Sequence, residues 1–288
     1  MKLSIIIVNY NGKHFFDACL KSIAEKVTFE HEVIVVDNAS ADGSVEHLQS
    51  NYPDVKLIQS ERNLGFAGGN NLGARYAEGR YLLLLNNDTI LLNDLSSAVE
   101  LMERDESVGI LGARMLGKNF EYRHSAGYFP EPLRLIRLAS LYLMHDGFLV
   151  GNFQSADECI PVDWIEGSFL LTPIEVWHQL GGLDETYFMY IEDVDYARRV
   201  MKLGKRTVYF PKMSYIHFGG FNRERIGMLV NGLRKYHEAH SGFIKKQIAN
   251  LILDAGLVLK GLLSLGGAVV NRSKFSQALL FFRALKRH

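Results

Sequence analysis

The sequence predicts an α/β fold that continues into a helical C-terminal extension. Short apolar runs alternate with segments whose apolar residues recur at helical spacing, which is the pattern of buried parallel strands joined by crossover helices. With 288 residues, 48% of them apolar and 22% charged, the chain can form a large core and lacks the composition of a disordered protein. Two cysteines, Cys19 and Cys159, argue against a disulfide scaffold and against a CxxC-type metal site.

Side-chain spacing places the individual elements of the α/β part. Between the first two apolar runs, Phe15, Cys19 and Ile23 recur every four residues, which predicts a helix with one apolar face. A further helix is expected around residues 95–102 and a late strand at residues 209–211. The apolar runs predicted to be strands are residues 3–8, 33–36, 55–58, 81–85 and 108–111.

The middle of the chain is less regular. Residues 130–146 carry apolar side chains at amphipathic spacing, which fits either a packed helix or a lid over the site. A second block of apolar and aromatic residues begins near Val162 and ends near Phe218. No internal repeat or low-complexity linker is visible in the sequence.

The balance of charge changes near residue 222. The whole chain carries no net charge, but residues 222–288 contain 12 Lys and Arg against 3 Asp and Glu, while residues 1–221 contain 20 against 29. We therefore predict an acidic domain at 1–221, suited to a cation-dependent reaction, and a basic helical region at 222–288 that meets anions or a membrane surface.

The basic region holds a long apolar stretch. Residues 248–270 form a largely apolar run that the charges of Asp254 and Lys260 interrupt, with five Gly or Ser among them, and a basic amphipathic stretch follows at 275–285. A charge at the centre of a spanning helix costs about 2.5–3.5 kcal/mol, so helices lying in the interface of an anionic membrane are favoured. The alternative is an ordinary helical subdomain or an oligomer interface. The apolar stretch argues against nucleic acid as the partner.

Polar residues gather where the predicted strands end. Parallel strands place ligands in the crevice beyond their carboxyl ends. The same residue types are also common in ordinary turns and at helix starts, but their appearance after three strands favours a binding site. The groups are Asn9-Tyr10-Asn11, Asp37-Asn38-Ala39-Ser40 and Asn86-Asn87-Asp88.

Three further features carry chemistry. The loop at residues 63–71 lacks the Lys of a P-loop and does not fit GxGxxG, yet its backbone amides and the following helix start could approach a diphosphate. Within the acidic and aromatic segment 181–195, Asp193 could act as a general base, although acids there also favour a helix start. Asp88 offers an oxygen ligand for Mg²⁺ or Mn²⁺, and His217 is either a second ligand or a packed histidine.

These segments together resemble the family 2 glycosyltransferases, most closely their bacterial rhamnosyltransferase-like branch. The resemblance covers about residues 2–220 and implies a GT-A fold with a Rossmann-like mixed sheet flanked by helices. It also implies a nucleotide-sugar donor, a divalent cation and inversion at the anomeric carbon. It rests on the segments IIIVNYN, VVDNASADGS, NLGFAGGNN, LLLLNND, DWIEGSFLLTP, GGLDETYFMYIEDVDYARR and IHFGG.

The resemblance assigns a role to each candidate residue. Asp193 is the expected catalytic base, and Asp88 with His217 would hold the cation, Asn86 standing where the family usually has a first carboxylate. The nucleotide sugar would meet Tyr10, Asn11, Asp37, Asn38, Asn63, Gly65, Asn70 and Asn87. The sugar and acceptor pocket would be lined by Trp164, Glu166, Gly167 and Glu192.

The expected activity is transfer of a sugar, rhamnose from dTDP-rhamnose being the best guess, to a glycan or polyprenyl-diphosphate-linked acceptor in synthesis of a bacterial surface polysaccharide such as O-antigen. The apolar run at residues 3–8 is too short for a signal peptide, so we expect a cytoplasmic protein peripheral to the inner face of the membrane. A homo-oligomer is left open. The alternatives are an inactive sugar-binding scaffold of the same fold and a nucleotidyltransferase.

Overall fold

The apolar runs of the sequence pair as neighbouring strands of one mixed sheet in the computed structural model, which describes residues 2–136, 153–220, 223–268 and 273–285. The strand order is β3-β2-β1-β4-β11-β6-β12-β5, with β7 added to β6 and β9 to β12. A short separate sheet pairs β10 (Trp164–Ile165) with β8 (Ala126–Gly127). The bounds of the main strands are β1 Leu3–Asn9, β2 His31–Asp37, β3 Lys56–Gln59, β4 Tyr81–Asn86, β5 Thr89–Leu91, β6 Val108–Leu116, β7 Tyr122–Arg123, β9 Ile160–Val162, β11 Phe169–Pro173 and β12 Arg206–His217.

Strand direction changes across the sheet. The strands β3, β2, β1 and β4 run parallel, as the alternation of apolar runs and helices predicted. Next to them, β11 runs antiparallel to both β4 and β6, and β12 runs parallel to β6 but antiparallel to β5. The predicted mixed α/β architecture is confirmed, and the predicted late strand is the middle of the longer β12.

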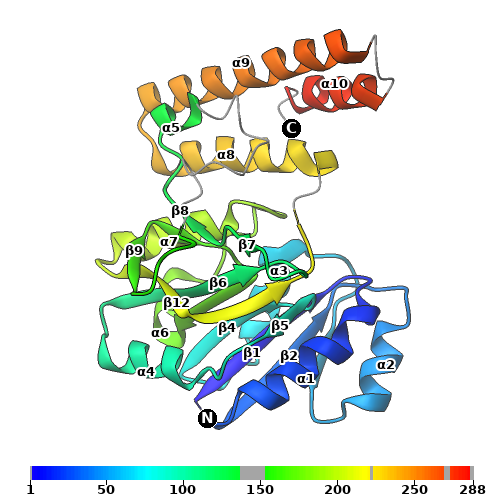
Figure 1. Ribbon diagram of the computed structural model, residues 1–288, viewed down its shortest axis with the longest axis vertical. Helices are drawn as coiled ribbons and strands as arrows, with labels where there is room; N and C mark the ends of the chain where they lie inside the picture. The colour runs from blue at the N-terminus through cyan, green and yellow to red at the C-terminus, as the bar shows by residue number, and fades with distance from the viewer. Residues whose placement is uncertain (1, 137–152, 221–222, 269–272, 286–288) are drawn as a thin grey trace. The chain divides into compact units, whose positions relative to one another are not determined.

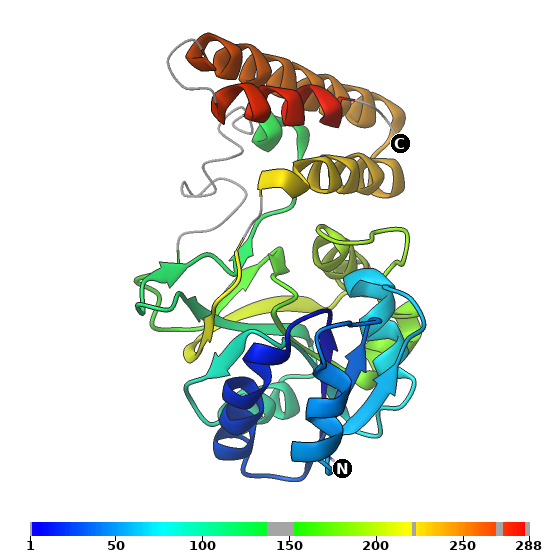
Figure 2. The ribbon, with the colours of Figure 1, turned by 90° about the vertical axis from the view of Figure 1, so that its right-hand side faces the viewer.

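Helices cover both faces of this sheet (Figures 1 and 2). On one face, Ile5 and Ile7 of β1 join a buried cluster with Phe16 and Cys19 of α1. The alternate side chain Ile6 faces α3 on the other side, because successive residues of a strand point to opposite faces. The first face carries α1 (Phe16–Lys26), α2 (Ser44–Asn51) and α4 (Ser96–Arg104), and the second carries α3 (Gly65–Ala74), α6 (Ile174–Leu180) and α7 (Glu192–Lys202).

Helix α3 lies unusually close to the sheet. A Cβ added at Gly69 would come within 2.7 Å of a methyl group of Val8, and one added at Gly73 within 2.6 Å of a methyl group of Ile6. The glycine-rich sequence of α3 therefore lets the helix backbone approach β1 directly. This close approach positions the start of α3 at the carboxyl ends of β1 and β2.

The chain divides into two compact units. Unit 1 comprises Met1–Gly127, Asn152–Phe188 and Glu192–Gly219 and contains the mixed sheet. Unit 2 comprises Tyr128–Gly151, Met189–Ile191 and Gly220–His288 and contains helices. Of the segment predicted to be a packed helix or a lid, residues 132–136 form α5 (Pro132–Ile136), and the part from 137 onward lies outside the described residues.

Unit 2 is helical, as the C-terminal spacing predicted. Helix α9 packs against α5, α8 and α10. By length and composition alone, its segment Phe243–Gly266 could cross a membrane, with a mean hydropathy of 1.7. The helices are α8 Ile226–His240, α9 Phe243–Ala268 and α10 Ser273–Ala284, drawn in yellow to red in Figure 1.

Candidate functional site

The carboxyl ends of β1, β2, β4 and β12 lie at one edge of the sheet. Asn9, the last residue of β1, is in register with Asp37, the last residue of β2. At the far side, His217 of β12 pairs with Thr89 of β5, and this pairing brings His217 beside Asp88. The antiparallel strand β11 begins at the same edge, so the segment before it also reaches the site.

Asn9 joins three chain segments at this edge. Its side chain is fully buried, and its amide nitrogen donates to Oδ1 of Asp37 at 2.8 Å and to Oγ of Ser40 at 3.0 Å. Its amide oxygen accepts a hydrogen bond of 2.7 Å from Asn87. The sequence placed Asn9 in the polar group Asn9-Tyr10-Asn11 but assigned it no role of its own, although a polar residue ending an otherwise apolar strand was a signal that could have identified one.

The residues after β2 are held firmly. Asp37 is buried, and its second carboxylate oxygen accepts from the backbone nitrogen of Ser40 at 2.9 Å. Asn38 is also buried and donates to the carbonyl of Gly65 at 3.0 Å. The amide oxygen of Asn38 has no hydrogen-bond partner among the described residues. Asn38 thus ties β2 to the start of α3.

The predicted loop residues shape the start of α3. The side-chain oxygen of Asn63 accepts from the backbone nitrogen of Gly65 at 2.9 Å, and Gly65 has a left-handed φ of +74°. The next backbone nitrogen, that of Phe66, donates to the carbonyl of Phe188 at 3.0 Å. Asn70 is buried and donates to the carbonyl of Phe66 at 2.9 Å. Donor contacts by the side chains of Asn63 and Asn70 remain predictions, since both side chains bind backbone here.

Tyr10 and Asn11 form the outer rim of the edge. The ring of Tyr10 is 55% exposed and offers an aromatic surface. Asn11 adopts a left-handed φ of +54°, accepts from the backbone nitrogen of Ala41 at 2.8 Å and braces the turn after β2. These contacts present Tyr10 beside the Asn9–Asp37 pair.

Asp88 and His217 form the second part of the site. Nε2 of His217 lies 3.2 Å from Oδ1 of Asp88 and 3.3 Å from the amide nitrogen of Asn86. On the other side of the ring, Nδ1 lies 3.2 Å from the sulfur of Met115 and 3.6 Å from Oε1 of Glu166. Burial lowers the pKa of His217, but the hydrogen bond with Asp88 and the charges of Glu166 and Asp88 outweigh it and raise the pKa.

The chain after β12 closes tightly around this pair. A Cβ at Gly219 would lie 2.5 Å from Oδ2 of Asp88 and 2.9 Å from Nε2 of His217, so a larger residue would fill the space between them. The guanidinium of Arg123 donates to the carbonyls of His217 at 3.1 Å and Gly219 at 2.5 Å. Arg123 was missed in the sequence because a single arginine outside a motif gives no signal.

Glu192 and Asp193 begin helix α7 on the acceptor side predicted from the sequence. The two oxygens of Asp193 accept from the backbone nitrogens of Gly167 at 3.0 Å and Val194 at 2.8 Å. Burial, followed by the charge of Glu166 and opposed by these hydrogen bonds, raises the pKa of Asp193 to about 6. Burial and the neighbouring charge of Asp193 raise the pKa of Glu192 well above its ordinary value. Burial is also the main cause of the raised pKa of Glu166.

Helix α7 is anchored independently of these two carboxyls. Asp195 forms a buried ion pair with Arg199 at 2.7 Å, and Arg199 also donates to the carbonyls of Leu180 and Gly182. Asp195 therefore stabilises the helix, as an acid in a first helical turn is expected to do. The two residues before the helix, Tyr190 and Ile191, have left-handed φ values of +71° and +73°, a conformation that costs energy for side chains of their size.

Two other predicted acceptor residues lie close by. Trp164 is half-buried on β10, opposite Gly127 of β8. Gly167 packs under the ring of Phe66, where an added Cβ would come within 2.8 Å of a ring carbon. The site thus has three parts on one sheet edge: the Asn9–Asp37 group, the Asp88–His217 pair, and the Glu192–Asp193 pair with Glu166.

Residues 4–160 match the sequence profile of the family described as Glycosyl transferase family 2. The chain belongs to that family. Over 231 residues it is 26% identical to the N-acetylglucosaminyl-diphospho-decaprenol L-rhamnosyltransferase of Mycobacterium tuberculosis (strain ATCC 25618 / H37Rv), with 75% of each chain covered. It is therefore a glycosyltransferase, which takes its sugar from a nucleotide donor.

Solved structures confirm the GT-A fold of this glycosyltransferase. Residues 1–349 of TarS from S. aureus in complex with UDP superpose with a TM-score of 0.59 at 19% identity, covering 99% of this chain and 81% of that one. The mannosyltransferase PcManGT from Pyrobaculum calidifontis, solved with GDP-Man and Mn²⁺, gives a TM-score of 0.58 at 16% identity, covering 98% and 85%. At these identities the likeness establishes the fold.

The glycosyltransferase offers two side chains to a divalent cation. Within the part of the chain that the structure describes, no three or more His, Cys, Asp or Glu side chains gather as a metal cage. Oδ1 of Asp88 and Nε2 of His217, 3.2 Å apart, can be neighbouring ligands of one ion. With its proton on Nδ1, towards Met115 and Glu166, His217 would present the lone pair of Nε2 to an ion that Asp88 also binds. An ion held by few protein ligands and completed by substrate phosphates is the usual arrangement for Mg²⁺ and Mn²⁺ sites.

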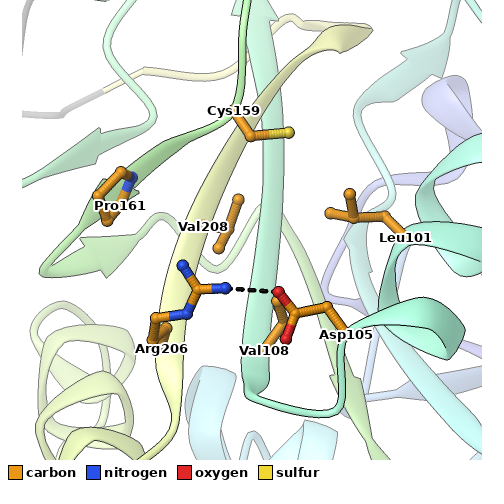
Figure 3. A pocket seen from close by; sticks show the side chains of 7 residues that line it. All are labelled: Leu101, Asp105, Val108, Cys159, Pro161, Arg206 and Val208. Carbon is orange, nitrogen blue, oxygen red and sulfur yellow. Dashed lines mark hydrogen bonds and ion pairs between the residues drawn. The ribbon is translucent and has the colours of Figure 1, made fainter.

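A cavity elsewhere in unit 1 has a different character. It has a volume of about 70 Å³ and lies where β6 and β12 begin, at the sheet edge away from Asp88 and His217 (Figure 3). The ion pair between Asp105 and Arg206, at 2.5 Å, crosses its lining. Ligand pockets usually measure roughly 300–1,000 Å³, so this cavity is too small for a nucleotide sugar.

Proposed function

We propose that this glycosyltransferase moves rhamnose from dTDP-rhamnose, with inversion at the anomeric carbon, to a hydroxyl of a polyprenyl-diphosphate-linked glycan. The reaction would serve bacterial surface polysaccharide synthesis, such as that of O-antigen. The proposal for the sugar and the acceptor draws on the named rhamnosyltransferase of M. tuberculosis. The proposal for the chemistry draws on the carboxyls at the start of α7.

The observation that carries the chemistry is the setting of Asp193. Its carboxylate is oriented by two backbone N–H groups, those of Gly167 and Val194, and its pKa is raised to about 6. A general base works best when its pKa lies near the operating pH, because it is then both ionised and basic. Asp193 therefore suits the removal of a proton from an acceptor hydroxyl at neutral pH.

The reaction follows as a single displacement. Asp193 takes the proton of the acceptor hydroxyl as the oxygen attacks the anomeric carbon from the face opposite the leaving group. The bond from that carbon to the diphosphate oxygen breaks, and the nucleoside diphosphate leaves with the electron pair. Burial and the charge of Asp193 raise the pKa of Glu192 well above its ordinary value, which favours its protonated form beside Asp193.

The donor would lie along the edge from Asp37 to Asp88. We assign the nucleoside to the segment around Tyr10, Asp37 and Asn38, where an exposed ring lies next to buried polar groups. The diphosphate would then reach Asp88 and His217. A divalent cation held there supplies positive charge to the diphosphate as negative charge develops on it.

We also propose that the enzyme works in the cytoplasm, at the inner face of the membrane. A polyprenyl-diphosphate acceptor is held in a bilayer, and both cysteines, Cys19 and Cys159, are free thiols, as is usual in a reducing compartment.

The experiment is a panel of nucleotide sugars supplied with Mn²⁺ or Mg²⁺ and a polyprenyl-diphosphate-linked GlcNAc acceptor. We expect release of dTDP from dTDP-rhamnose and a product of inverted anomeric configuration, measured by mass spectrometry and NMR. Asp193→Asn should lower kcat by about 10²–10⁴-fold while donor binding persists. Glu175→Gln, which neutralises an exposed carboxylate on α6, is the matched control and should keep full activity.

Other outcomes of the panel would each overturn a named part of the proposal. Turnover of a different nucleotide sugar would replace rhamnose as the donor. Release of pyrophosphate would indicate nucleotidyl transfer, and donor binding without turnover would indicate an inactive scaffold. Retained activity in Asp193→Asn would remove Asp193 as the base.

A further inference from the structure

Helix α9 has its polarity reversed with respect to an ordinary surface helix. Along one face, large apolar side chains are exposed to solvent, with Ile244 73%, Leu251 70% and Leu262 56% exposed. On the opposite face, Leu253 and Leu257 are buried within unit 2. We call the exposed face the α9 stripe; its residues are Ile244, Ile248, Leu251, Ala255, Val258 and Leu262.

The spacing of the stripe makes it continuous. Its residues follow one another at intervals of three or four, so they lie above one another on one side of the helix. None of them is charged. Exposed apolar patches of this extent on soluble proteins usually mark an interaction surface, because leaving such side chains in water is unfavourable.

No charged residue stands within the stripe, and three of the four charged side chains of α9 form ion pairs within unit 2. Asp254 binds the buried guanidinium of Arg234 on α8 at 2.5 Å. Lys246 binds Glu238 of α8 at 2.5 Å, and Lys245 binds Glu131 at 3.3 Å. Lys260 stands two positions from both Val258 and Leu262, which puts it on the other side of the helix. The stripe itself is thus free of charge, and the flanking residues Lys245 and Asp254 are paired within unit 2.

Charge decides between the surfaces that could cover the stripe. Residues 222–288 carry 12 Lys and Arg against 3 Asp and Glu, and Lys274 and Arg283 are exposed on α10, which packs against α9. A second copy would bring the same positive charge to the contact and be repelled. Anionic lipid headgroups would be attracted by the basic side chains while the stripe enters the acyl boundary.

The packing of α9 also indicates its orientation. Its inner face is occupied by α8 and α10, and the Asp254–Arg234 pair lies about midway along it. A helix crossing the bilayer alone would expose that inner face to lipid, and unpaired charges there are costly. We propose that the α9 stripe seats unit 2 in the surface of an anionic membrane, with α9 lying in the plane of the membrane.

The test is flotation of the full chain with lipid vesicles. One set contains phosphatidylglycerol and phosphatidylethanolamine, and the other contains phosphatidylcholine only. The wild type should float with the anionic vesicles and be released by alkaline carbonate. Leu251→Glu with Leu262→Glu should lower the vesicle-bound fraction at least ten-fold. The matched control, Phe120→Glu with Met201→Glu, adds the same charge at exposed apolar residues of unit 1 and should bind like the wild type.

Donor hydrolysis by the same variants keeps this proposal separate from the proposed function, because unit 1 holds the catalytic residues. Equal vesicle binding by the stripe variant and the wild type would refute the stripe as the membrane surface. Equal binding to neutral vesicles would refute the electrostatic part, and resistance to carbonate would refute the in-plane orientation. A wild-type dimer that the stripe substitutions dissociate, without vesicle binding, would show that a second copy covers the stripe.

Discussion

The amide nitrogen of Asn9 lies 2.8 Å from Oδ1 of Asp37, across the register of β1 and β2. The same side chain accepts from Asn87 at 2.7 Å, so one buried amide connects the ends of three neighbouring strands. The part of the site that we propose to bind the nucleotide therefore depends on a residue that need not touch the nucleotide.

Removing this amide should disturb both stability and donor binding. Asn9→Ala removes the hydrogen bonds that it makes to Oδ1 of Asp37 and from the amide nitrogen of Asn87, and each unsatisfied buried polar group costs about 1–3 kcal/mol. We expect a loss of about 2 kcal/mol in the free energy of unfolding and a KM for the donor raised at least ten-fold. Urea denaturation and donor titration measure the two effects. Asn51→Ala, at an exposed helix end, should change stability by no more than about 0.5 kcal/mol.

The Asp88–His217 pair should determine the affinity for the cation. Asp88→Asn removes a charged oxygen ligand and His217→Ala removes Nε2, so each should weaken Mn²⁺ binding by about 10–100-fold. Calorimetric titration of Mn²⁺ in the presence of the nucleoside diphosphate measures this directly. Asp94→Asn, an exposed carboxylate after β5, serves as the control. Unchanged Mn²⁺ affinity in both site variants would place the cation elsewhere.

Activity should fall in acid because Asp193 must be ionised to accept a proton. With the pKa of Asp193 at about 6, kcat/KM at saturating Mn²⁺ should be level above that value and fall about ten-fold per pH unit below it. The residual activity of Asp193→Asn should lack this limb. A wild-type limb near pH 4 would mean that Asp193 titrates like an ordinary surface carboxyl.

Glu192 should reduce stability at neutral pH. Its pKa is raised by burial and by Asp193, so the folded state holds the proton more strongly than the unfolded state does. The stability contributed by the protonated form is present in acid, below the unfolded pKa, and is lost as the pH rises towards the folded pKa. Glu192→Gln mimics the protonated form and should raise Tm by roughly 2–4 °C at pH 8, the shift expected from about 1 kcal/mol.

The comparison at lower pH distinguishes this cause from general stabilisation. At pH 4 the wild-type carboxyl is itself protonated, so the difference in Tm between Glu192→Gln and the wild type should nearly vanish. Differential scanning calorimetry at the two pH values measures it. An equal gain at both would mean that ionisation of Glu192 is not the cause.

The start of α3 should tolerate no side chain at Gly65. Its φ of +74° strains any other residue, and an added Cβ would lie 2.2 Å from the carbonyl oxygen of Phe188. Gly204 has a similar φ of +77° with nothing within 4 Å of an added Cβ, so Gly204→Ala measures the backbone strain alone. Gly65→Ala should lose about 2 kcal/mol more than this control in chemical denaturation, together with donor binding. An equal loss of unfolding free energy in the two variants would show that the backbone of Phe188 moves aside without destabilising the protein.

The parallel half of the sheet could be predicted because each strand there is a continuous apolar run. Residues 3–8, 33–36, 81–85 and 108–111 lie within observed strands, and the run at 55–58 begins one residue before β3. The short strands β5 and β11 were not predicted, since three or five residues give too little periodicity to separate a strand from a loop. Their direction depends on pairing with distant strands, which one sequence does not reveal.

The candidate site likewise contains residues that the sequence identified and residues that it did not. Asp88, His217 and Asp193 stand in motifs, and the sheet brings Asp88 and His217 within 3.2 Å. Asn9 and Arg123 act through contacts with residues far along the chain, at separations of 28 and 94 positions. Arg123 has no local signal of its role, and the only signal of Asn9 is a polar residue at the end of an apolar run. Their importance depends on what the fold places beside them.

The glycines of α3 limit which positions around the site can be substituted. Where Gly69 and Gly73 meet Val8 and Ile6, the helix has no room for even one methyl group, so the donor side of the site cannot be remodelled by substituting those positions. Trp164 is half-buried on a strand of only two residues. Because we propose that Trp164 and Glu166 line the acceptor pocket, a library aimed at altered acceptor specificity should begin at residues 164–166.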